Sequence, residues 1–568
     1  MSKEIAKNKK DSSELSKYDL IKIVEKLESR KKYGLIWDEE KVKEQFEKDA
    51  VNALPVLKEV KGKEISDKNG GPVNILIEGD NYHALSVLNF THQGKIDVIY
   101  IDPPYNTGDK SWRYNNDYIE KDDTYRHSKW ISFMFKRLQL AKSLLKENGT
   151  LVCAIDENEQ PRLGLMLEEI FPNHEIVCVS VVHNPRGIQG VNFSYCHEYV
   201  YFVYPSDGKQ YISTHERENP SLRNFRDSGG ESMRTDAKTC FYPIITKNGK
   251  IIGFGDVPDQ KFHPKGINEK IKDGSVYIWP VDSVGAERKW RYSRSSVEEI
   301  KDSLQVKEVR GKFDIYIYKD EDRYKTVWID SKYDASEYGT KLIKRILGSN
   351  VFSFPKSIYA VKECLLAVAK DNKDAIIVDF FAGSGTTGHA ILEMNKKDNG
   401  NRSFILCTNN ENGICEEVCY PRIKSVINGY KDKINNEVID GLGGNLKYFK
   451  TKFVKDASNK DDFKIRITKE CTEMLCLREG IFDEIKKTDD YRIFQQGNQT
   501  LAVYYSLDRK ALSDLKKELN KTNGDKVFYC FTLDPLGVDK SDFIGWNNVS
   551  LEPIPQKILD VYKQIYEY

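Results

Sequence analysis

Short hydrophobic runs alternate with amphipathic stretches in two separate parts of the chain. The runs are 75–79, 96–101, 150–155, 175–182 and 198–204, and then, much later, 375–380 and 403–408. Between them, segments such as 129–149 and 161–171 place apolar residues at three- and four-residue spacing, which is typical of helices. This alternation predicts an α/β fold built on a doubly wound, mostly parallel sheet.

The same pattern divides the chain into five segments. Residues 1–60 are highly charged and predict a helical N-terminal extension, and residues 61–204 carry the first set of strands. Residues 205–350 are irregular, polar and rich in Arg, Lys, Tyr and Trp. The strand–helix alternation returns in residues 351–435, and residues 436–568 hold mixed apolar segments that end in an amphipathic tail.

Composition indicates the cellular compartment of the protein but does not indicate its substrate. The formal net charge is +1, so any surface that binds nucleic acid must come from a local arrangement of the 88 Lys and Arg residues. No apolar run is long enough to span a bilayer, and the N-terminus lacks the apolar core of a signal peptide. The eleven Cys residues are scattered, which favours free thiols over a metal site. We expect a cytoplasmic protein with no membrane contact and no metal.

The clearest chemical motif is Asp102-Pro103-Pro104-Tyr105, directly after the run 96–101. A carboxylate and a rigid backbone carbonyl can both accept hydrogen bonds from an aromatic amine such as that of adenine, which helps its nitrogen to become pyramidal and nucleophilic. Two prolines fix the direction of the carbonyl and donate no competing N–H. Tyr105 offers a ring face for a base extruded from a duplex. Taken alone, the tetrapeptide could equally be a turn that ends a strand.

A second motif, DFFAGSGTT, follows the run 375–380 and opens a helix. Gly383 and Gly385 allow the backbone to approach a ligand closely, and the helix N-terminus adds N–H donors. The motif is neither a phosphate-binding loop nor the dinucleotide fingerprint, because it lacks the Gly-Lys-Ser/Thr and Gly-x-Gly-x-x-Gly spacings. By itself it could be only a tight strand–helix turn.

Together the two motifs resemble those of the amino-methylating DNA methyltransferases of the beta class, in which the catalytic motif precedes the cofactor loop. The resemblance implies a circularly permuted, seven-stranded Rossmann-like sheet, in which 375–380 and 403–408 lie beside 75–79. It also implies S-adenosylmethionine as cofactor, and methylation of N6 of adenine after base flipping. Asp102, Pro103, Pro104 and Tyr105 would then be the catalytic residues.

The resemblance also implies a set of cofactor-binding positions. Asp80 ends the strand beside the catalytic one, and the segment FSFPKSIY (352–359) would wrap the methionine end of the cofactor. The implied cofactor residues are Asp80, Lys356, Ser357, Asp379, Phe381, Gly383, Gly385, Thr386 and Thr408. The residue that meets the ribose stays open among Thr408, Asn409 and Glu411. Asn106 and Phe193, the latter in the loop 184–194, are candidates for the pocket of the flipped base.

Further segments resemble the modification subunit of Type III restriction–modification systems. They include YGLIWDEE, IEGDNYHALSVL, YIDPPYNTGDKSWRYNNDY and the closing LEPIPQKILDVYKQI. This resemblance implies double-stranded DNA as substrate, a homodimer and a separate restriction subunit as partner. Residues 205–350 would be the target-recognition domain, with stretches such as RKWRYSR (288–294) contacting DNA, and residues 436–568 a dimerisation or docking domain.

Two other functions stay open for the same motifs. N4-cytosine methylation uses the same cofactor core, although Ser usually replaces the leading Asp of the catalytic motif. A DNA-binding specificity module without chemistry is a second alternative, and the intact Asp102 and Tyr105 argue against it. The scattered acidic residues near 258–259 and 287–289 do not make a convincing nuclease site. The recognition sequence cannot be read from the chain.

Overall fold

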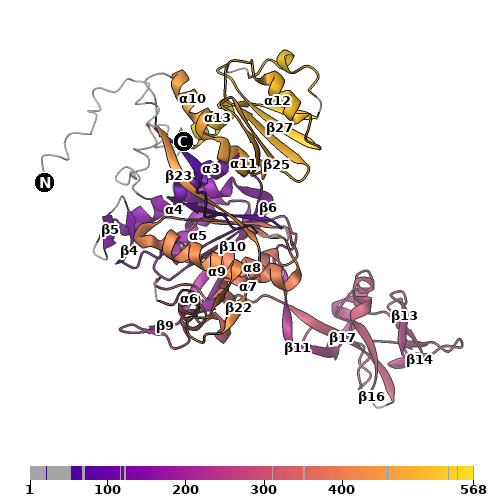
Figure 1. The fold of residues 1–568 in the computed structure, drawn as a ribbon. Coiled ribbons are helices and arrows are strands. Elements are labelled where there is room, and N and C mark those ends of the chain that lie inside the picture. Colours follow the sequence, from indigo (N-terminus) through magenta and orange to yellow (C-terminus); the bar gives the residue numbers. More distant parts are fainter. Residues whose placement is uncertain are drawn as a thin grey trace. The chain divides into compact units, whose positions relative to one another are not determined.

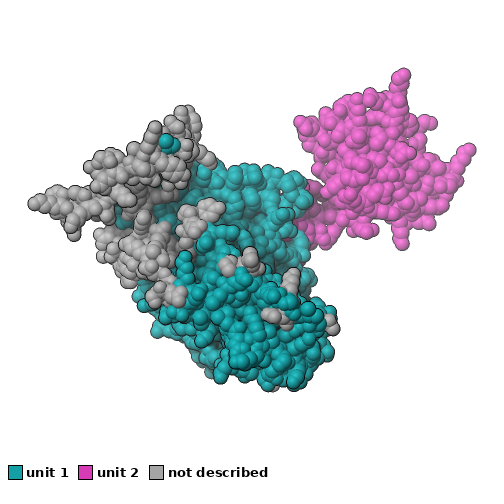
Figure 2. All heavy atoms as spheres, turned by 90° about the horizontal axis from the view of Figure 1, so that it is seen from above, with its two compact units in different colours: residues 1–211, 325–568 teal, residues 212–324 magenta. Residues whose placement is uncertain are grey.

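The computed structural model describes residues 53–66, 71–114, 117–120, 123–309, 311–349, 352–455, 460–534, 537–546 and 548–566, together with Ile21 and Trp37. The helical extension expected in residues 1–60 therefore lies mostly outside the described residues, while Ala53–Glu59 forms strand β1. The chain separates into two compact units, one of residues 1–211 and 325–568 and one of residues 212–324 (Figures 1 and 2).

A ten-stranded sheet forms the centre of the larger unit, in the order β1-β23-β2-β20-β19-β3-β6-β10-β7-β18 (Figure 1). Its strands are β1 (Ala53–Glu59), β2 (Val73–Glu78), β3 (Ile96–Ile101), β6 (Leu145–Ile155), β7 (His174–Val182), β10 (His197–Pro205), β18 (Val327–Trp328), β19 (Ile376–Asp379), β20 (Ser403–Thr408) and β23 (Asn445–Lys455). The strands from β23 to β6 are parallel, and β10 runs antiparallel to both β6 and β7.

Seven of these strands, from β2 to β7, are those that the hydrophobic pattern predicts. β19 and β20 lie between β2 and β3, although they come more than 270 residues later in the chain. This is the circularly permuted α/β sheet that the order of the two motifs implies. β1 and β23 extend the sheet beyond β2, and β18 extends it beyond β7.

Helices cover both faces of the sheet because its central strands are apolar on both sides. One core unites the strands with α3 (Asn81–Thr91), α4 (Arg126–Lys142) and α5 (Gln160–Ile170). The opposite face carries α7 (Ile358–Ala369), α8 (Thr386–Asp398) and α9 (Tyr420–Asn428) (Figure 1). In α4 the buried residues Trp130, Met134, Arg137 and Ala141 follow helical spacing.

The helix predicted for residues 129–149 is shorter than expected. α4 ends at Lys142, and Leu145 begins strand β6, where it pairs with Ile96 across an irregular register. Pairing with β3 therefore overrides the helical periodicity in residues 145–148.

The unit of residues 212–324 has its own core. It contains the sheet β11-β17-β16, from β11 (Thr214–Asn224), β17 (Lys312–Arg323) and β16 (Leu304–Val309), and the sheet β13-β12-β15-β14. The latter consists of β12 (Ile244–Lys247), β13 (Lys250–Phe254), β14 (Asn268–Lys270) and β15 (Val276–Ile278). The unit is narrower than the expected segment 205–350, because β18 pairs with β7 and residues 325–349 belong to the larger unit.

Residues 436–568 are not separate from the main sheet, since β23 lies between β1 and β2. A five-stranded sheet follows, formed by β24 (Asp483–Lys487), β25 (Tyr491–Gln496), β26 (Gln499–Tyr504), β27 (Asp525–Phe531) and β28 (Val549–Ile554). One face of it packs into the main core through residues such as Leu501 and Tyr529, together with α10 (Lys460–Glu470), α11 (Thr472–Glu479) and α13 (Gln556–Tyr566). The other face covers α12 (Leu512–Leu519).

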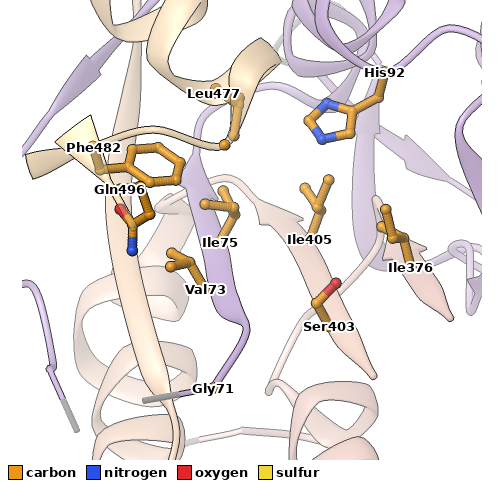
Figure 3. A pocket seen from close by; sticks show the side chains of 11 residues that line it. Gly71, Val73, Ile75, His92, Ile376, Ser403, Ile405, Leu477, Phe482 and Gln496 are labelled. Carbon is orange, nitrogen blue, oxygen red and sulfur yellow. The ribbon is translucent and has the colours of Figure 1, made fainter. Parts of the chain in front are cut away.

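A cavity of about 300 Å³ lies where this C-terminal part meets the amino ends of β2, β19 and β20 (Figure 3). Its walls include Val73, Ile376 and Ser403 from the main sheet and Leu477 and Phe482 from the C-terminal part. The cavity is thus at the sheet edge opposite to the carboxyl ends of the same strands.

Among the described helices, none is long and apolar enough to cross a membrane.

Candidate active site

The two sequence motifs meet at one edge of the sheet. Asp102 follows β3 and the glycine-rich turn follows β19, and these two strands are parallel neighbours. The carboxyl ends of adjacent parallel strands form the crevice in which doubly wound folds bind ligands. The topology therefore brings the candidate catalytic and cofactor residues together, although about 280 residues separate them in the sequence.

A cluster of ionisable groups surrounds Asp102. The Lys356 ammonium lies 3.4 Å from Asp102 Oδ1, and it also contacts the Glu198 carboxylate and the Tyr105 hydroxyl. The Tyr105 hydroxyl donates to Glu198 Oε2 at 3.1 Å. Because Lys356 comes from the segment before α7, Glu198 from β10 and Tyr105 from the loop after β3, this cluster joins three distant parts of the chain.

Burial and charge pairing set the protonation of this cluster. Burial raises the pKa of Asp102, and the nearby Lys356 ammonium opposes this only in part. Burial also acts to raise the pKa of Glu198, but the same ammonium outweighs it and lowers that pKa below the ordinary value. For Lys356 burial acts downward, and the two carboxylates outweigh it and raise its pKa. Lys356 therefore stays charged, and Asp102 is the carboxylate of the cluster that accepts a proton more readily.

The two prolines of the motif have different environments. The Pro104 carbonyl accepts a hydrogen bond from the indole N–H of Trp130 at 2.6 Å, which ties the motif to α4. Within the described part of the chain, no hydrogen bond reaches the Pro103 carbonyl. Pro103 therefore keeps an acceptor next to Asp102, while Pro104 anchors the loop.

Asn106, one of the two candidates for the base pocket, is fully buried behind the motif. Its backbone has φ +57°, and its amide donates to the Glu159 carboxylate and to the Arg126 carbonyl. Glu159 also contacts His127 Nδ1 at 2.5 Å. In this position Asn106 holds the left-handed turn after Tyr105. The scaffold of the loop therefore uses its amide donors, and its role in the pocket of the flipped base stays a prediction.

The glycine-rich turn uses its own carboxylate internally. Asp379 accepts hydrogen bonds from the Phe381 N–H at 2.9 Å and from the Thr387 hydroxyl at 2.5 Å. Burial raises the pKa of Asp379 to about 7. Gly383 and Gly385 have φ values of +49° and +78°, a region that favours glycine. Asp379 thus shapes the loop, and the glycines leave its outer backbone open to a ligand.

A buried arginine lies beneath this turn. The Arg422 guanidinium, on α9, donates to the Thr386 hydroxyl at 2.8 Å and the Ser384 hydroxyl at 3.1 Å. It is fully buried and forms no salt bridge with a carboxylate in the described part of the chain, and its Nε lacks a hydrogen-bond partner there. Burial lowers the pKa of Arg422 to about 10. The Arg422 guanidinium thus holds the hydroxyls at the N-terminus of α8 in place. The Thr386 hydroxyl accepts a hydrogen bond from this guanidinium and so is not free to point only toward a ligand.

Asp80 is held at the crevice by a second buried arginine. Asp80 caps α3 by accepting from the Tyr82 N–H at 2.8 Å, and its carboxylate lies 3.5 Å from Arg137. Arg137 also donates to Asn81, whose amide donates to the Phe380 carbonyl at 2.9 Å. Asp80 remains about half exposed. Its strand, β2, is not beside the catalytic strand β3 as predicted, because β20 and β19 lie between them. The hydrogen bond from Asn81 to Phe380 still holds this end of β2 close to the end of β19.

The remaining candidates are distributed around the same edge. Ser357 is buried, and its hydroxyl donates to the Lys332 carbonyl at 2.7 Å. The Thr408 carbonyl accepts from the Gly79 N–H, while Asn409 is exposed and caps the turn at Glu411. Phe381 lies 5.9 Å from the ring of Phe133. Phe193 is 77% exposed on a hairpin.

Sequence reasoning missed the residues that support the motifs. Glu198 was not among the predicted site residues and Lys356 was predicted to bind the cofactor, yet the two contact each other and Tyr105. Arg422 and Glu159 carried no motif at all. A polar residue at the head of an apolar strand, as in HEYVYFVY, is the one signal that could have indicated Glu198. Among the described residues, no group of His, Cys, Asp and Glu could hold a metal ion.

Comparisons with known proteins identify the family of the chain. A family model described as "DNA methylase" matches residues 96–418, more than half of the chain. The EcoPI Mod subunit of a Type III restriction–modification enzyme, from Escherichia phage P1, is 28% identical over 67% of this chain and 64% of its own length. The Type II methyltransferase M.KpnI from Klebsiella pneumoniae is 31% identical over 58% of this chain and 79% of its own. The StyLTI Mod subunit from Salmonella typhimurium is 30% identical over 60% of this chain and 53% of its own length.

The chain thus matches slightly less than two thirds of the EcoPI Mod subunit. Similar solved structures include the M1.HpyAVI–SAM complex, which is 13% identical in sequence and has a TM-score of 0.28. The match covers 62% of this chain and 98% of that chain. A putative DNA modification methylase from Thermus thermophilus, complexed with S-adenosyl-L-methionine, has 10% identity, 66% and 99% coverage, and a TM-score of 0.30.

Proposed function

Because the chain belongs to the DNA methylase family, we propose that it transfers a methyl group from S-adenosylmethionine to N6 of adenine in double-stranded DNA. The observation that carries this proposal is the pairing of two acceptors at one strand end. The Asp102 carboxylate and the Pro103 carbonyl lie side by side in sequence, next to the ring of Tyr105. Two acceptors match the two N–H groups of an exocyclic amine.

The crevice suits S-adenosylmethionine as methyl donor. The backbone of Gly383 and Gly385 would approach its methionine end, and Asp80, at the end of β2, would meet its adenosine end. The other proposed cofactor residues are Phe381 and Thr386 in the glycine-rich turn, and Lys356 and Ser357 in the segment before α7. The candidates for contact with the ribose remain Thr408, Asn409 and Glu411. The bound cofactor supplies an electrophilic methyl group on a sulfonium centre. A side chain on Gly383 would meet Phe352 at 3.3 Å, so the turn depends on having none there.

The catalytic residues would act on the target amine by hydrogen bonding. Asp102 and the Pro103 carbonyl each accept one N–H, which shifts electron density to the nitrogen as it becomes tetrahedral. Asp102 can then take the proton that the methylated amine must lose, because burial raises its pKa. Lys356 and Glu198 hold Asp102 and the Tyr105 hydroxyl in place. The Tyr105 ring would stack on the extruded base.

A methylation assay with labelled S-adenosylmethionine and mixed DNA tests the proposal. Nucleoside analysis of the product should yield N6-methyladenine, whereas N4-methylcytosine would favour the runner-up activity. Asp102→Ala should abolish turnover and leave DNA binding intact, because it removes an acceptor and no phosphate contact. Glu147→Ala, which removes an exposed carboxylate from the amino end of β6, opposite to the site, is the matched control. Full turnover in Asp102→Ala would contradict the mechanism.

The inserted unit would recognise the target sequence, as part of the segment 205–350. Its core is independent of the main sheet, which suits a replaceable module. The stretch 288–294 is a weaker candidate for base contacts than its composition suggests. Trp290 is fully buried, and Arg288 and Arg291 pair with Asp282 and Asp227. Exchange of this unit with that of a related enzyme should move the methylated sequence with it.

The similarity to two Type III Mod subunits supports a place in such a system. The protein would act in the cytoplasm as a homodimer and would require a separate restriction subunit to cut DNA. Light scattering should give twice the monomer mass, and the full-length chain should co-purify with a Type III restriction subunit. A monomer that methylates at the normal rate would contradict the dimer. Truncation near residue 436 is unsuitable as a test, because it would remove β23 from the main sheet.

A further inference from the structure

A hairpin beside the active site exposes apolar side chains to solvent. It consists of β8 (Ile188–Gln189) and β9 (Ser194–Tyr195), with the Gly190 N–H donating to the Phe193 carbonyl at 3.0 Å across the tip. Val191 is fully exposed, Phe193 is 77% exposed, and Ile188 and Tyr195 are also exposed. These exposed side chains add little to the stability of the folded chain, because apolar side chains stabilise a fold only when they are buried.

The hairpin is anchored to the active-site edge of the sheet. It connects the end of β7 with the start of β10, and β10 runs antiparallel to β6, whose carboxyl end lies next to that of β3. Glu198, the second residue of β10, contacts Tyr105 and Lys356. Phe193 is five residues from Glu198, so its Cα lies at most about 17 Å from that of Glu198 along an extended chain.

The charge of the hairpin suits a polyanion. Residues 184–197 contain no acidic residue, in a chain in which 31% of residues are charged, and Arg186 is their one permanent charge. Arg186 is exposed near the base of the hairpin. Apolar side chains at a tip, with a cation near the base and no carboxylate to repel phosphates, match the composition of side chains that enter a base stack.

We propose that Phe193 and Val191 form a wedge that enters the DNA duplex and occupies the space vacated by the extruded adenine. This inference rests on the proposed function and extends it to the residues that stabilise the extruded state. Extrusion costs the stacking and pairing of the target base, and an inserted ring replaces part of that stacking. Phe193 would then contact the neighbouring base pairs, while Tyr105 stacks on the target adenine itself.

The test compares two duplexes that carry the methylated sequence, one fully paired and one with an abasic site opposite the target adenine. Phe193→Ala should slow single-turnover methylation of the paired duplex about tenfold or more, since the variant must bear the full cost of extrusion. On the duplex with the abasic site, where the adenine is already unpaired and extrusion costs only its stacking, the variant should be slowed much less. Val438→Ala, which removes an equally exposed apolar side chain from another hairpin, is the matched control and should change neither rate.

The outcomes separate the wedge from its alternatives. Equal slowing on both duplexes would overturn the wedge and assign Phe193 to the pocket of the target base. An unchanged rate on the paired duplex would also overturn it, as would a shift from dimer to monomer in light scattering, which would make the hairpin a contact between two copies of the chain. Failure of wild type to methylate either duplex would instead contradict the proposed function.

Discussion

The two loops that form the active site follow neighbouring parallel strands, yet they are built in opposite ways. The loop after β3 works through side chains, and its ionised groups compensate one another, with the Lys356 ammonium beside Asp102 and Glu198. The loop after β19 works through its backbone. Its carboxylate, Asp379, bonds within the loop, and the cation beneath it, Arg422, forms no salt bridge with any described residue.

The difference indicates how each loop should respond to substitution. A loop of mutually paired charges loses stability and chemistry together when one partner is removed, because the remaining charges stay buried. A loop that works through its backbone should lose ligand affinity first, since its side chains are absent or face inward. The following predictions test this contrast, from the largest expected effect to the smallest.

Lys356→Met should have the largest effect. It leaves the Asp102 and Glu198 carboxylates buried without their cation, which should lower the free energy of unfolding by about 3–5 kcal/mol and stop methylation. Denaturant unfolding and single-turnover kinetics measure the two effects. Lys362→Met, which removes a more exposed partner of Glu393, should cost at most about 1 kcal/mol. Equal losses of unfolding free energy in the two variants would show that the charges around Asp102 are no more strongly coupled than an ordinary surface ion pair.

The second prediction concerns pH. Asp379 has a pKa of about 7 in the folded protein against 3.8 ordinarily, so the folded state keeps a proton that the unfolded chain releases. Stability should therefore fall as pH rises from about 5 to 7, by about 2 kcal/mol for this group. Asp379→Asn, which cannot ionise, should remove that part of the slope. Parallel stability–pH curves for wild type and variant would show that Asp379 is ionised throughout.

Gly383→Val should mainly affect ligand binding. A non-glycine residue at φ +49° costs about 1–2 kcal/mol of stability, and the added side chain would fill space beside Phe352. Affinity for S-adenosylmethionine, measured by calorimetry, should fall at least tenfold. Gly62→Val introduces a similar backbone strain in open space far from the motifs and should leave affinity unchanged. Wild-type affinity in Gly383→Val would place the cofactor elsewhere.

The smallest effect is expected at the opposite edge of the sheet. Val73→Ile adds a methylene group next to the cavity at the amino ends of β2, β19 and β20. Partial filling should stabilise the fold by about 0.5–1 kcal/mol without altering cofactor affinity or methylation. Calorimetric unfolding measures the gain. A change in affinity would mean that function is not confined to the carboxyl ends of the strands.

Much of the sheet could be predicted from the sequence because its central strands are buried on both faces. Runs such as 96–101 and 403–408 are mostly apolar, and they form β3 and β20 with the predicted bounds. β1 and β23 were missed because both lie in charged segments at one side of the sheet, and β23 interleaves Lys with its apolar residues instead of forming an apolar run. The bounds of the inserted unit depend on the pairing of β18 with β7, a contact of two residues that no periodicity reveals.

At the site, motifs identified the residues that bear the chemistry but not those that support them. Asp102 and Gly383 lie in local patterns with a direct physical meaning. Glu198, Arg422 and Glu159 act through contacts made over 36 to 93 residues, in the strands and helices that pack behind the loops. A single sequence carries no record of such pairs.

The permuted strand order has a consequence for the growing chain on the ribosome. β2 and β3 emerge early, but the strands that separate them in the sheet, β20 and β19, are made more than 270 residues later, and β23 follows both. Until then β2 has no native partner and β3 pairs only with β6, so closing the sheet requires contacts that are distant in sequence. A chain that stops early would contain Asp102 and Tyr105 without the glycine-rich turn. Synthesis itself therefore delays the assembly of a complete active site until nearly the whole central sheet has been made.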